Sequence, residues 1–299
     1  MPRDKCIILL SEKSSGSSPC QRLLAKAADI KHVSKTRHSQ KETLYWVKAA
    51  SILGKPQVEM VNSEVPIKQG KARRDLVALL TDNLDDFAPP ETDKALIMNG
   101  WRALCRRYAP VFLEKSPHHL CQWSALELIL QCMKELEDID FLLIGLVRNP
   151  LDTIYSQYKR WGSPPGKVQA QWVVAYQNLL RLKTILGEKL LILRYEDIVQ
   201  SIHHLEPVFR FCGVKTTMVN NDLHARSIRK WQDDRLFGYS LSPDAIALAA
   251  AYGYKKDELI NTKAQLLWPV ISFLSHAAHI TSRPLRKLKQ NVRQFRFRT

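Results

Sequence analysis

The chain has 299 residues, with 45 Lys or Arg against 29 Asp or Glu and therefore a formal net charge of +16 at neutral pH. Its hydrophobic content of 45% excludes a disordered composition, and it contains no apolar run of the roughly 18 residues that a membrane span requires. A chain of this length buries roughly 75% of its unfolded surface, so a large core can stabilise it without disulfides or metal ions.

The excess of positive charge is unevenly distributed. The last 19 residues contain no acid and seven basic residues, Arg283, Arg286, Lys287, Lys289, Arg293, Arg296 and Arg298, which leaves +9 of the +16 for the rest of the chain. A basic body favours an anionic ligand such as phosphate, nucleic acid or an acidic polymer. Composition does not choose among these ligands.

Cysteine usage indicates a reducing compartment. The six cysteines are scattered without any CxxC pair, several of them in apolar surroundings: Cys6, Cys20, Cys105, Cys121, Cys132 and Cys212. We expect reduced, buried thiols, and no His or Cys spacing fits a metal site. The first residues lack the features of a secretory signal, so we expect a cytoplasmic protein.

The first predicted unit is a strand, a loop and a helix. Cys6–Leu10 is short, apolar and bounded by polar residues, as in a buried strand of a parallel sheet. A Ser-rich loop over residues 11–18 follows. The segment Pro19–Ala28 has helical spacing, with Ser18 as the predicted N-cap and Pro19 as the first helical residue.

The rest of the chain alternates helices and buried strands. A capping box from Ser39 to Glu42 predicts a helix that ends near Gly54. Further helices are predicted over 72–84, 119–135, 151–161, 168–186, from 195 towards 213, and 243–251, with strands over 111–113, 141–147 and 190–193 and a surface loop over 82–93.

This alternation predicts an α/β fold with a single parallel β-sheet flanked by helices on both faces. Ligands of such sheets bind at the carboxyl ends of the strands. We expect one domain over residues 1–260. Residues 261–299 form an apolar and then basic extension, either interfacial or disordered.

The loop from Lys13 to Ser18 lies between a strand and a helix, where backbone N–H groups and the positive end of the helix dipole can hold an anion. Gly16 allows close approach of the backbone, hydroxyls can donate to anionic oxygens, and Lys13 adds a positive charge. An ordinary Ser-capped turn is the alternative. The GxxxxGK[ST] pattern of nucleoside triphosphatases is absent.

A second polar element follows the predicted strand over 141–147. Arg148 would emerge at the carboxyl end of that strand, where its guanidinium can pair with a phosphate. Asn149 and Pro150 suit the cap and the first helical position, and Ser156 could face the same ligand. The alternative is an ion pair between Arg148 and Asp152.

Four segments in this order resemble the motifs of the sulfotransferase family. They are Ser15–Ser18, Phe112–Pro117, Val147–Pro150 with Ser156 and Tyr158, and Arg194–Asp197 before a helix ending at Gly213. Lys230, Trp231 and Tyr252–Tyr254 are similar to the closing segment of that family. The resemblance covers roughly residues 5 to 255.

The resemblance implies transfer of a sulfuryl group from 3′-phosphoadenosine-5′-phosphosulfate (PAPS) to an acceptor hydroxyl or amine, on a P-loop fold related to the nucleotide kinases and without a metal. It assigns the first loop to the 5′-phosphosulfate and Arg148 with Ser156 to the 3′-phosphate. The implied cofactor-binding residues are Lys13, Ser14, Ser15, Gly16, Ser17, Ser18, Arg148, Ser156, Tyr195, Arg229 and Lys230. Two positions depart from the family pattern, Ser14 where Arg or Lys is common and Pro19 where an apolar residue is common.

The base that would activate the acceptor is left open by the sequence. Family members use a His or a Glu, so His38 is the first candidate and Glu42 the second, with His118 and His119 in reserve. The alternatives are a capping role for Glu42 and a surface position for His38. Lys115 could stabilise charge on the bridging oxygen or lie at the surface, and His203 and His204 are expected at the surface.

Two other functions stay possible at this stage, a kinase-like enzyme acting on nucleotide phosphates and a non-catalytic protein that binds polyanions or membranes. The acceptor is not specified by the sequence, and a glycan, a lipid-linked sugar, a small alcohol and a peptide tyrosine are all open. Leu266–Phe273 followed by the basic tail resembles an interfacial anchor, so residues 265–299 are a candidate contact with an anionic membrane surface. Nucleic acid is not the leading partner.

Overall fold

The computed structural model describes residues 3–27, 29–36, 38, 42–214, 223, 225–263 and 267–274. Within these residues, five strands form one parallel sheet in the order β2-β3-β1-β4-β5. The strands are β1 (Asp4–Ser11), β2 (Ile30–Lys31), β3 (Val111–Lys115), β4 (Ile139–Val147) and β5 (Leu190–Arg194). The predicted fold class is confirmed.

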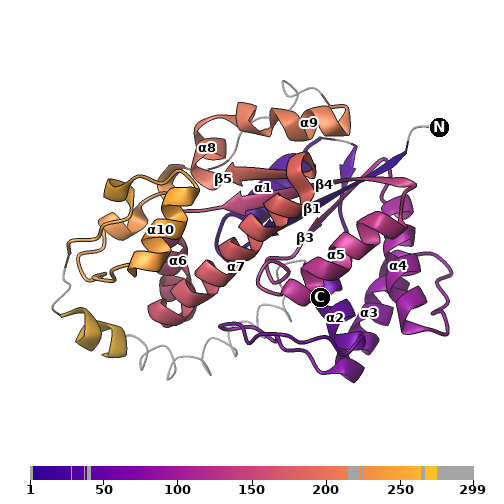
Figure 1. Cartoon of the computed structure of the whole chain (residues 1–299), viewed down its shortest axis with the longest axis horizontal. Coiled ribbons are helices and arrows are strands. Elements are labelled where there is room, and N and C mark those ends of the chain that lie inside the picture. The colour runs from indigo at the N-terminus through magenta and orange to yellow at the C-terminus, as the bar shows by residue number, and fades with distance from the viewer. Residues whose placement is uncertain are drawn as a thin grey trace, which may run out of the picture.

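Ten α-helices accompany the sheet in the described part of the chain. They are α1 (Ser17–Leu24), α2 (Tyr45–Ile52), α3 (Gln69–Asn83), α4 (Asp93–Arg107), α5 (Trp123–Glu135), α6 (Pro150–Trp161), α7 (Pro165–Leu186), α8 (Tyr195–Gln200), α9 (Glu206–Cys212) and α10 (Pro243–Ala251). Figure 1 shows α5 and α7 in front of the strands, whereas α8 and α9 lie above them.

Alternation along β1 divides the core into two layers, because successive side chains of a strand point to opposite faces. Cys6, Ile8 and Leu10 pack with the helices α2–α7 and α10. Ile7 and Leu9 pack with α1, α8 and α9. Both faces of the sheet are therefore covered, as in other all-parallel sheets.

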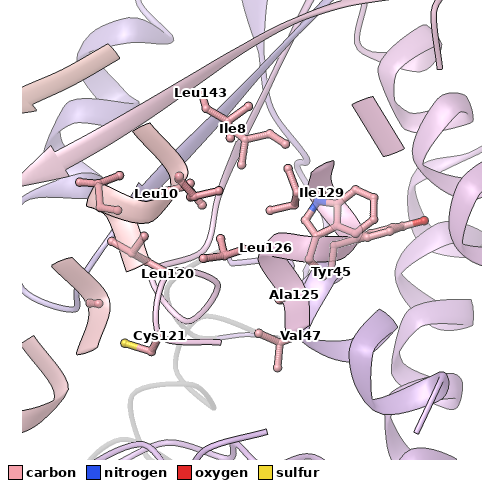
Figure 2. Close-up of a cluster of buried hydrophobic side chains, with 14 of the residues drawn as sticks. Ile8, Leu10, Tyr45, Val47, Leu120, Cys121, Ala125, Leu126, Ile129 and Leu143 are labelled. Atoms are coloured by element: carbon pink, nitrogen blue, oxygen red, sulfur yellow. The ribbon is translucent and has the colours of Figure 1, made fainter. Parts of the chain in front are cut away.

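Figure 2 shows part of the first layer, where Ile8, Leu10 and Leu143 of the sheet face Leu126 and Ile129 of α5. All five side chains are fully buried. Burying a side chain of this size stabilises a fold by about 1.5–3 kcal/mol. This packing fixes α5 against the sheet.

The strand order places the chemistry-bearing loops together. β1 is central, with β3 on one side and β4 on the other. The order of the strands therefore reverses direction at β1, which creates a topological switch point. The loop after β1 and the Arg148-Asn149 corner after β4 lie at the same edge of the sheet because all strands are parallel. A ligand site is expected there.

Two predicted helix starts are wrong. α1 begins at Ser17 after Gly16, which has φ +90°, so Ser18 is not the N-cap and Pro19 is not the first helical residue. α2 begins at Tyr45, not near the predicted Ser39–Glu42 capping box. Ser39 lies outside the described residues, and Glu42 pairs elsewhere, as described below.

Other boundaries differ less. The Asn149 cap and the Pro150 start of α6 are confirmed. The helix predicted from residue 195 towards 213 is divided into α8 and α9, because Ser201 is extended (φ −151°). β2 and α4 had no sequence prediction. All six cysteines are free and buried.

Candidate active site

The loop after β1 is anchored by Glu12, whose carboxylate is fully buried. Gln157 donates to it at 3.1 Å, Cys121 donates at 3.1 Å, and Gln171 also donates. The Ser15 N–H donates to the Glu12 carbonyl at 3.2 Å. The role of Glu12 was not predictable from the sequence, because its partners are 109 to 159 residues away and no local pattern links them.

The backbone of the loop turns sharply at Ser14 and Gly16, which have φ +64° and +90°. The Ser15 hydroxyl lies 2.9 Å from the hydroxyl of Tyr176 in the core. The Ser14 Oγ, in contrast, is buried without a hydrogen-bond partner. Of these two hydroxyls, that of Ser14 is the one left for a ligand.

Gly16 packs directly against Tyr195, the first residue of α8. A Cβ at position 16 would lie 2.3 Å from ring carbons of Tyr195, too close for any side chain. Ser17 begins α1 and is buried, and the Ser18 hydroxyl accepts a hydrogen bond from Lys115 at 3.1 Å. The loop is thus shaped by Tyr195 on one side and Lys115 on another.

Arg148 connects this loop with the segment before Lys230. Its guanidinium donates to the carbonyl of Ser14 at 2.9 Å and to the carbonyl of Ser227. The guanidinium lies 5.0 Å from the ring centre of Tyr195, whose hydroxyl is 3.2 Å from the Ser227 hydroxyl. The Arg148 Nε is buried without a hydrogen-bond partner.

The alternative ion pair between Arg148 and Asp152 does not form. Asp152 is buried, and neither of its carboxylate oxygens accepts a hydrogen bond from Arg148. Burial raises the pKa of Asp152 to about 6, although Arg148 opposes the rise. Arg148 therefore keeps its positive charge directed at the loop.

Three other residues of the predicted cofactor set are more exposed than Arg148. Ser156 is half-buried on α6. Arg229 is exposed and pairs with Glu258 at 2.9 Å, and Lys230 is exposed at the start of a 3₁₀ turn (Lys230–Gln232).

Lys13 is buried, and its ammonium donates to the carbonyls of Val61 and Asn62. Burial lowers the pKa of Lys13. Its charge is therefore directed at the segment between α2 and α3, not at Arg148.

Lys115 ends β3 and is buried, which excludes the surface position considered from the sequence. Its ammonium lies 3.1 Å from Glu42 Oε1, and the Glu42 side chain is only 6% exposed. Burial alone would raise the pKa of Glu42, but a hydrogen bond from His118 and the charge of Lys115 lower it to about 2. Glu42 is therefore ionised and paired.

Two histidines contact the second oxygen of Glu42. His118 Nδ1 lies 3.4 Å from Glu42 Oε2, and His38 Nδ1 lies 3.5 Å from the same oxygen. His118 is buried, whereas the His38 side chain is 26% exposed. Burial lowers the pKa of His38, although Glu42 opposes the shift, so the imidazole is neutral near pH 7.

His119 belongs to a separate buried pair. It lies 3.4 Å from Glu114, and both side chains are fully buried. Glu114 also accepts hydrogen bonds from Thr43 at 2.6 Å and from Ser116 at 2.5 Å. This network fastens the segment before α2 to the end of β3, and it leaves His119 no access to an acceptor.

A cavity of about 270 Å³ opens beside His38 and Glu42. It is lined by Thr36, His38, Glu42, Leu44, Lys48, Glu64, Lys71, Asp75, Leu79 and Asp82, contributed by the segment before α2, by α2, by Glu64 and by α3. In the described part of the chain, no group of three or more His, Cys, Asp or Glu residues could hold a metal ion.

The fold is that of a parallel α/β protein, and Lys115 contacts both the polar loop region after the first strand and a residue that lines a polar cavity. Residues 7–218 match the model of the sulfotransferase family, and the chain belongs to this family. A comparison with curated protein sequences finds no match.

Solved structures show the same fold. The sulfotransferase domain of the olefin synthase of Synechococcus PCC 7002 is 19% identical, with a TM-score of 0.56 over 85% of this chain and 96% of that domain. The sulfotransferase domain of the curacin biosynthetic pathway is also 19% identical, with a TM-score of 0.53 over 85% of this chain and 99% of that domain. The sequence resemblance to sulfotransferases is confirmed.

The pairing of Lys115 with Glu42 predicts a measurable effect on stability. Glu42→Gln leaves a buried ammonium without its counter-charge and should lower the free energy of unfolding by about 3–5 kcal/mol at pH 7. Adding Lys115→Met should recover much of this loss. Urea denaturation of the single and double variants measures the coupling.

The pH dependence has a defined sign. The pKa of Glu42 is lowered from 4.5 to about 2. Its ionised form therefore contributes fully to the free energy of unfolding above pH 4.5, and this contribution is lost as the pH falls towards 2. The difference between the wild type and Glu42→Gln should shrink over this range. Glu135→Gln, at the exposed pair with Lys94, is the control and should change stability by less than about 1 kcal/mol. An equal effect of both substitutions would contradict the assignment.

Proposed function

We propose that the protein is a PAPS-dependent sulfotransferase whose donor site is the loop from Lys13 to Ser18 and whose acceptor site is the cavity beside His38. The observation that carries the proposal is the position of Lys115. Its ammonium contacts Ser18 on the donor side and Glu42 on the acceptor side, each at 3.1 Å. A cation placed between the two sites can stabilise the negative charge that develops on a bridging oxygen.

Two buried polar atoms support a phosphate ligand at the donor site. Ser14 Oγ and Arg148 Nε have no hydrogen-bond partner, and a buried polar atom without a partner costs about 1–3 kcal/mol. A phosphate bound at this loop could supply a hydrogen-bond partner to each of them. Arg148 now donates to two carbonyls, and a charge-assisted bond to phosphate is stronger than either of these.

The proposed reaction is a single displacement at sulfur. The oxygen or nitrogen of the acceptor forms a bond to sulfur while the bond from sulfur to the bridging phosphate oxygen breaks. The proton of the acceptor passes to a base on the protein, and the electron pair of the broken bond leaves with adenosine 3′,5′-bisphosphate. Lys115 and the N–H groups at the start of α1 stabilise that leaving group.

We assign the base to His38 and an orienting role to Glu42. The lowered pKa of His38 keeps its imidazole neutral and able to accept a proton, whereas Glu42, with a pKa of about 2, is a weak base. Contact of Glu42 Oε2 with His38 Nδ1 at 3.5 Å holds the ring and stabilises its protonated form. His118 contacts the same oxygen and helps to fix Glu42.

The charges that line the cavity favour a polar acceptor that is neutral or cationic. Four carboxylates and two ammonium groups line it, and only Leu44 and Leu79 are apolar. Lys71 lies 2.6 Å from both Glu64 and Asp75, so its charge is locally compensated. An acceptor with several hydroxyls and an amino group matches this lining better than an acidic glycan.

Nucleotide binding tests the donor site. Arg148→Ala should weaken adenosine 3′,5′-bisphosphate binding by at least about tenfold, because it removes a charge-assisted hydrogen bond worth about 1.5–3 kcal/mol. Gly16→Ala should weaken it as well, through the clash with Tyr195. Isothermal titration calorimetry measures both effects.

Gly54→Ala is the matched control, since Gly54 has φ +65° but no atom within 4 Å of an added Cβ. It should bind the nucleotide like the wild type. Unchanged affinity of Arg148→Ala would contradict the assignment, and equally tight binding of ATP would favour the kinase-like alternative.

The dependence of kcat/KM on pH tests the base. The acidic limb should have its midpoint below the ordinary histidine value of 6.5, because burial lowers the pKa of His38. His38→Gln should reduce the rate by about 10²–10⁴-fold and remove this limb. His203→Gln alters an exposed histidine and should leave the profile unchanged. A rate that survives in His38→Gln but not in Glu42→Gln would transfer the role to Glu42.

A comparison of acceptors with opposite charge tests whether the cavity binds the acceptor. On one hydroxylated scaffold, an amino-substituted acceptor should be sulfated with a higher kcat/KM than its carboxylate-substituted counterpart. Asp82→Asn should reduce this preference about fivefold, since one charge pair at 4 Å in water contributes about 1 kcal/mol. Asp85→Asn is the control, because Asp85 does not line the cavity. Preference for the carboxylate would overturn the proposal.

A further inference from the structure

The segment over residues 267–274 exposes an unusual apolar surface. Residues 268–274 are helical and contain no charged side chain. Leu267, Val270, Phe273 and Leu274 are 62%, 60%, 73% and 61% exposed. Elsewhere in the described chain, large exposed apolar side chains are separated along the sequence, as Leu236 is. Exposed apolar residues that are grouped together mark an interaction surface.

The opposite side of this short helix is fastened to the body of the protein. The Trp268 ring lies 5.4 Å from that of Tyr158 on α6 and 5.1 Å from that of Phe237. It also lies 6.3 Å from the ring of Tyr239. Trp268 therefore packs against this part of the core, whereas the apolar side chains at 267, 270, 273 and 274 remain exposed.

The charge that follows the helix indicates the partner. Residues 281–299 carry seven Lys or Arg and no acid. An apolar helix face next to a basic segment is the combination that binds an anionic lipid surface, where apolar insertion and electrostatic attraction add. No helix in the described ranges is both long and apolar enough to cross a membrane.

We propose that the apolar face of residues 267–274 docks the protein on an anionic lipid surface, the partner that the basic composition of residues 281–299 favours. The apolar side chains enter the boundary between headgroups and acyl chains, and the positive charge that follows them in the sequence attracts the anionic headgroups. This inference is independent of the proposed enzymatic activity, because it involves none of the residues of the donor or acceptor site.

Vesicle co-sedimentation of the full chain tests the proposal. Binding to phosphatidylcholine vesicles that contain phosphatidylserine should exceed binding to phosphatidylcholine alone, and salt should weaken it. Phe273→Ser with Leu274→Ser should reduce binding about tenfold or more, through loss of apolar insertion. Arg293→Gln, Arg296→Gln and Arg298→Gln together should reduce it and flatten the salt dependence.

Leu236→Ser is the matched control, since Leu236 is equally exposed at 62% but is followed by no basic segment. It should bind vesicles like the wild type, and all variants should keep the thermal unfolding midpoint of the wild type. Equal binding to both kinds of vesicle would overturn the proposal. So would a wild-type dimer, detected by light scattering, that Phe273→Ser with Leu274→Ser dissociates, because the helix would then contact a second copy.

Discussion

A buried ammonium group, that of Lys115, imposes the strongest constraint on this site. Transferring an unpaired charge from water to a protein interior costs several kcal/mol, so the group is tolerated only where the fold supplies a counter-charge and further acceptors. Glu42 provides the charge and Ser18 provides a hydroxyl. Three segments that are distant in sequence, the start of α1, the end of β3 and the residues before α2, are thereby held in one arrangement. The proposed donor and acceptor sites share that arrangement.

Features that depend on neighbouring residues were predictable from the sequence. The apolar runs at β1, β4 and β5 identify buried strands, and strands that alternate with helices identify a parallel sheet. Because parallel strands end at one edge, the sequence alone predicts that the loop after β1 and Arg148 after β4 lie at the same edge of the sheet. The Asn149 cap and Pro150 start of α6 follow the same local rules.

Features that depend on distant partners were not predictable. The Ser39–Glu42 capping box is a local signature, but the Glu42 carboxylate pairs with Lys115, 73 residues away, because that contact compensates a buried charge. The observed start of α1 differs from the predicted one for a similar reason, since the turn before the helix packs closely through Gly16 against the distant Tyr195. Glu12 gave no signal, because its donors come from three separate parts of the chain.

The distribution of charge distinguishes the two proposed substrate sites more sharply than the net charge does. On the proposed donor side, Arg148 and Lys115 contact a loop whose backbone N–H groups add further positive potential. The proposed acceptor cavity is lined by four carboxylates and two ammonium groups, and one of the four, Glu42, is paired with Lys115, although the chain as a whole carries +16. Under the proposed function, an anion would be attracted to the first site and disfavoured in the second. In the proposed reaction, the same polarity would move the product away from this cavity, because transfer of a sulfuryl group would turn a neutral hydroxyl compound into an anion beside Glu42.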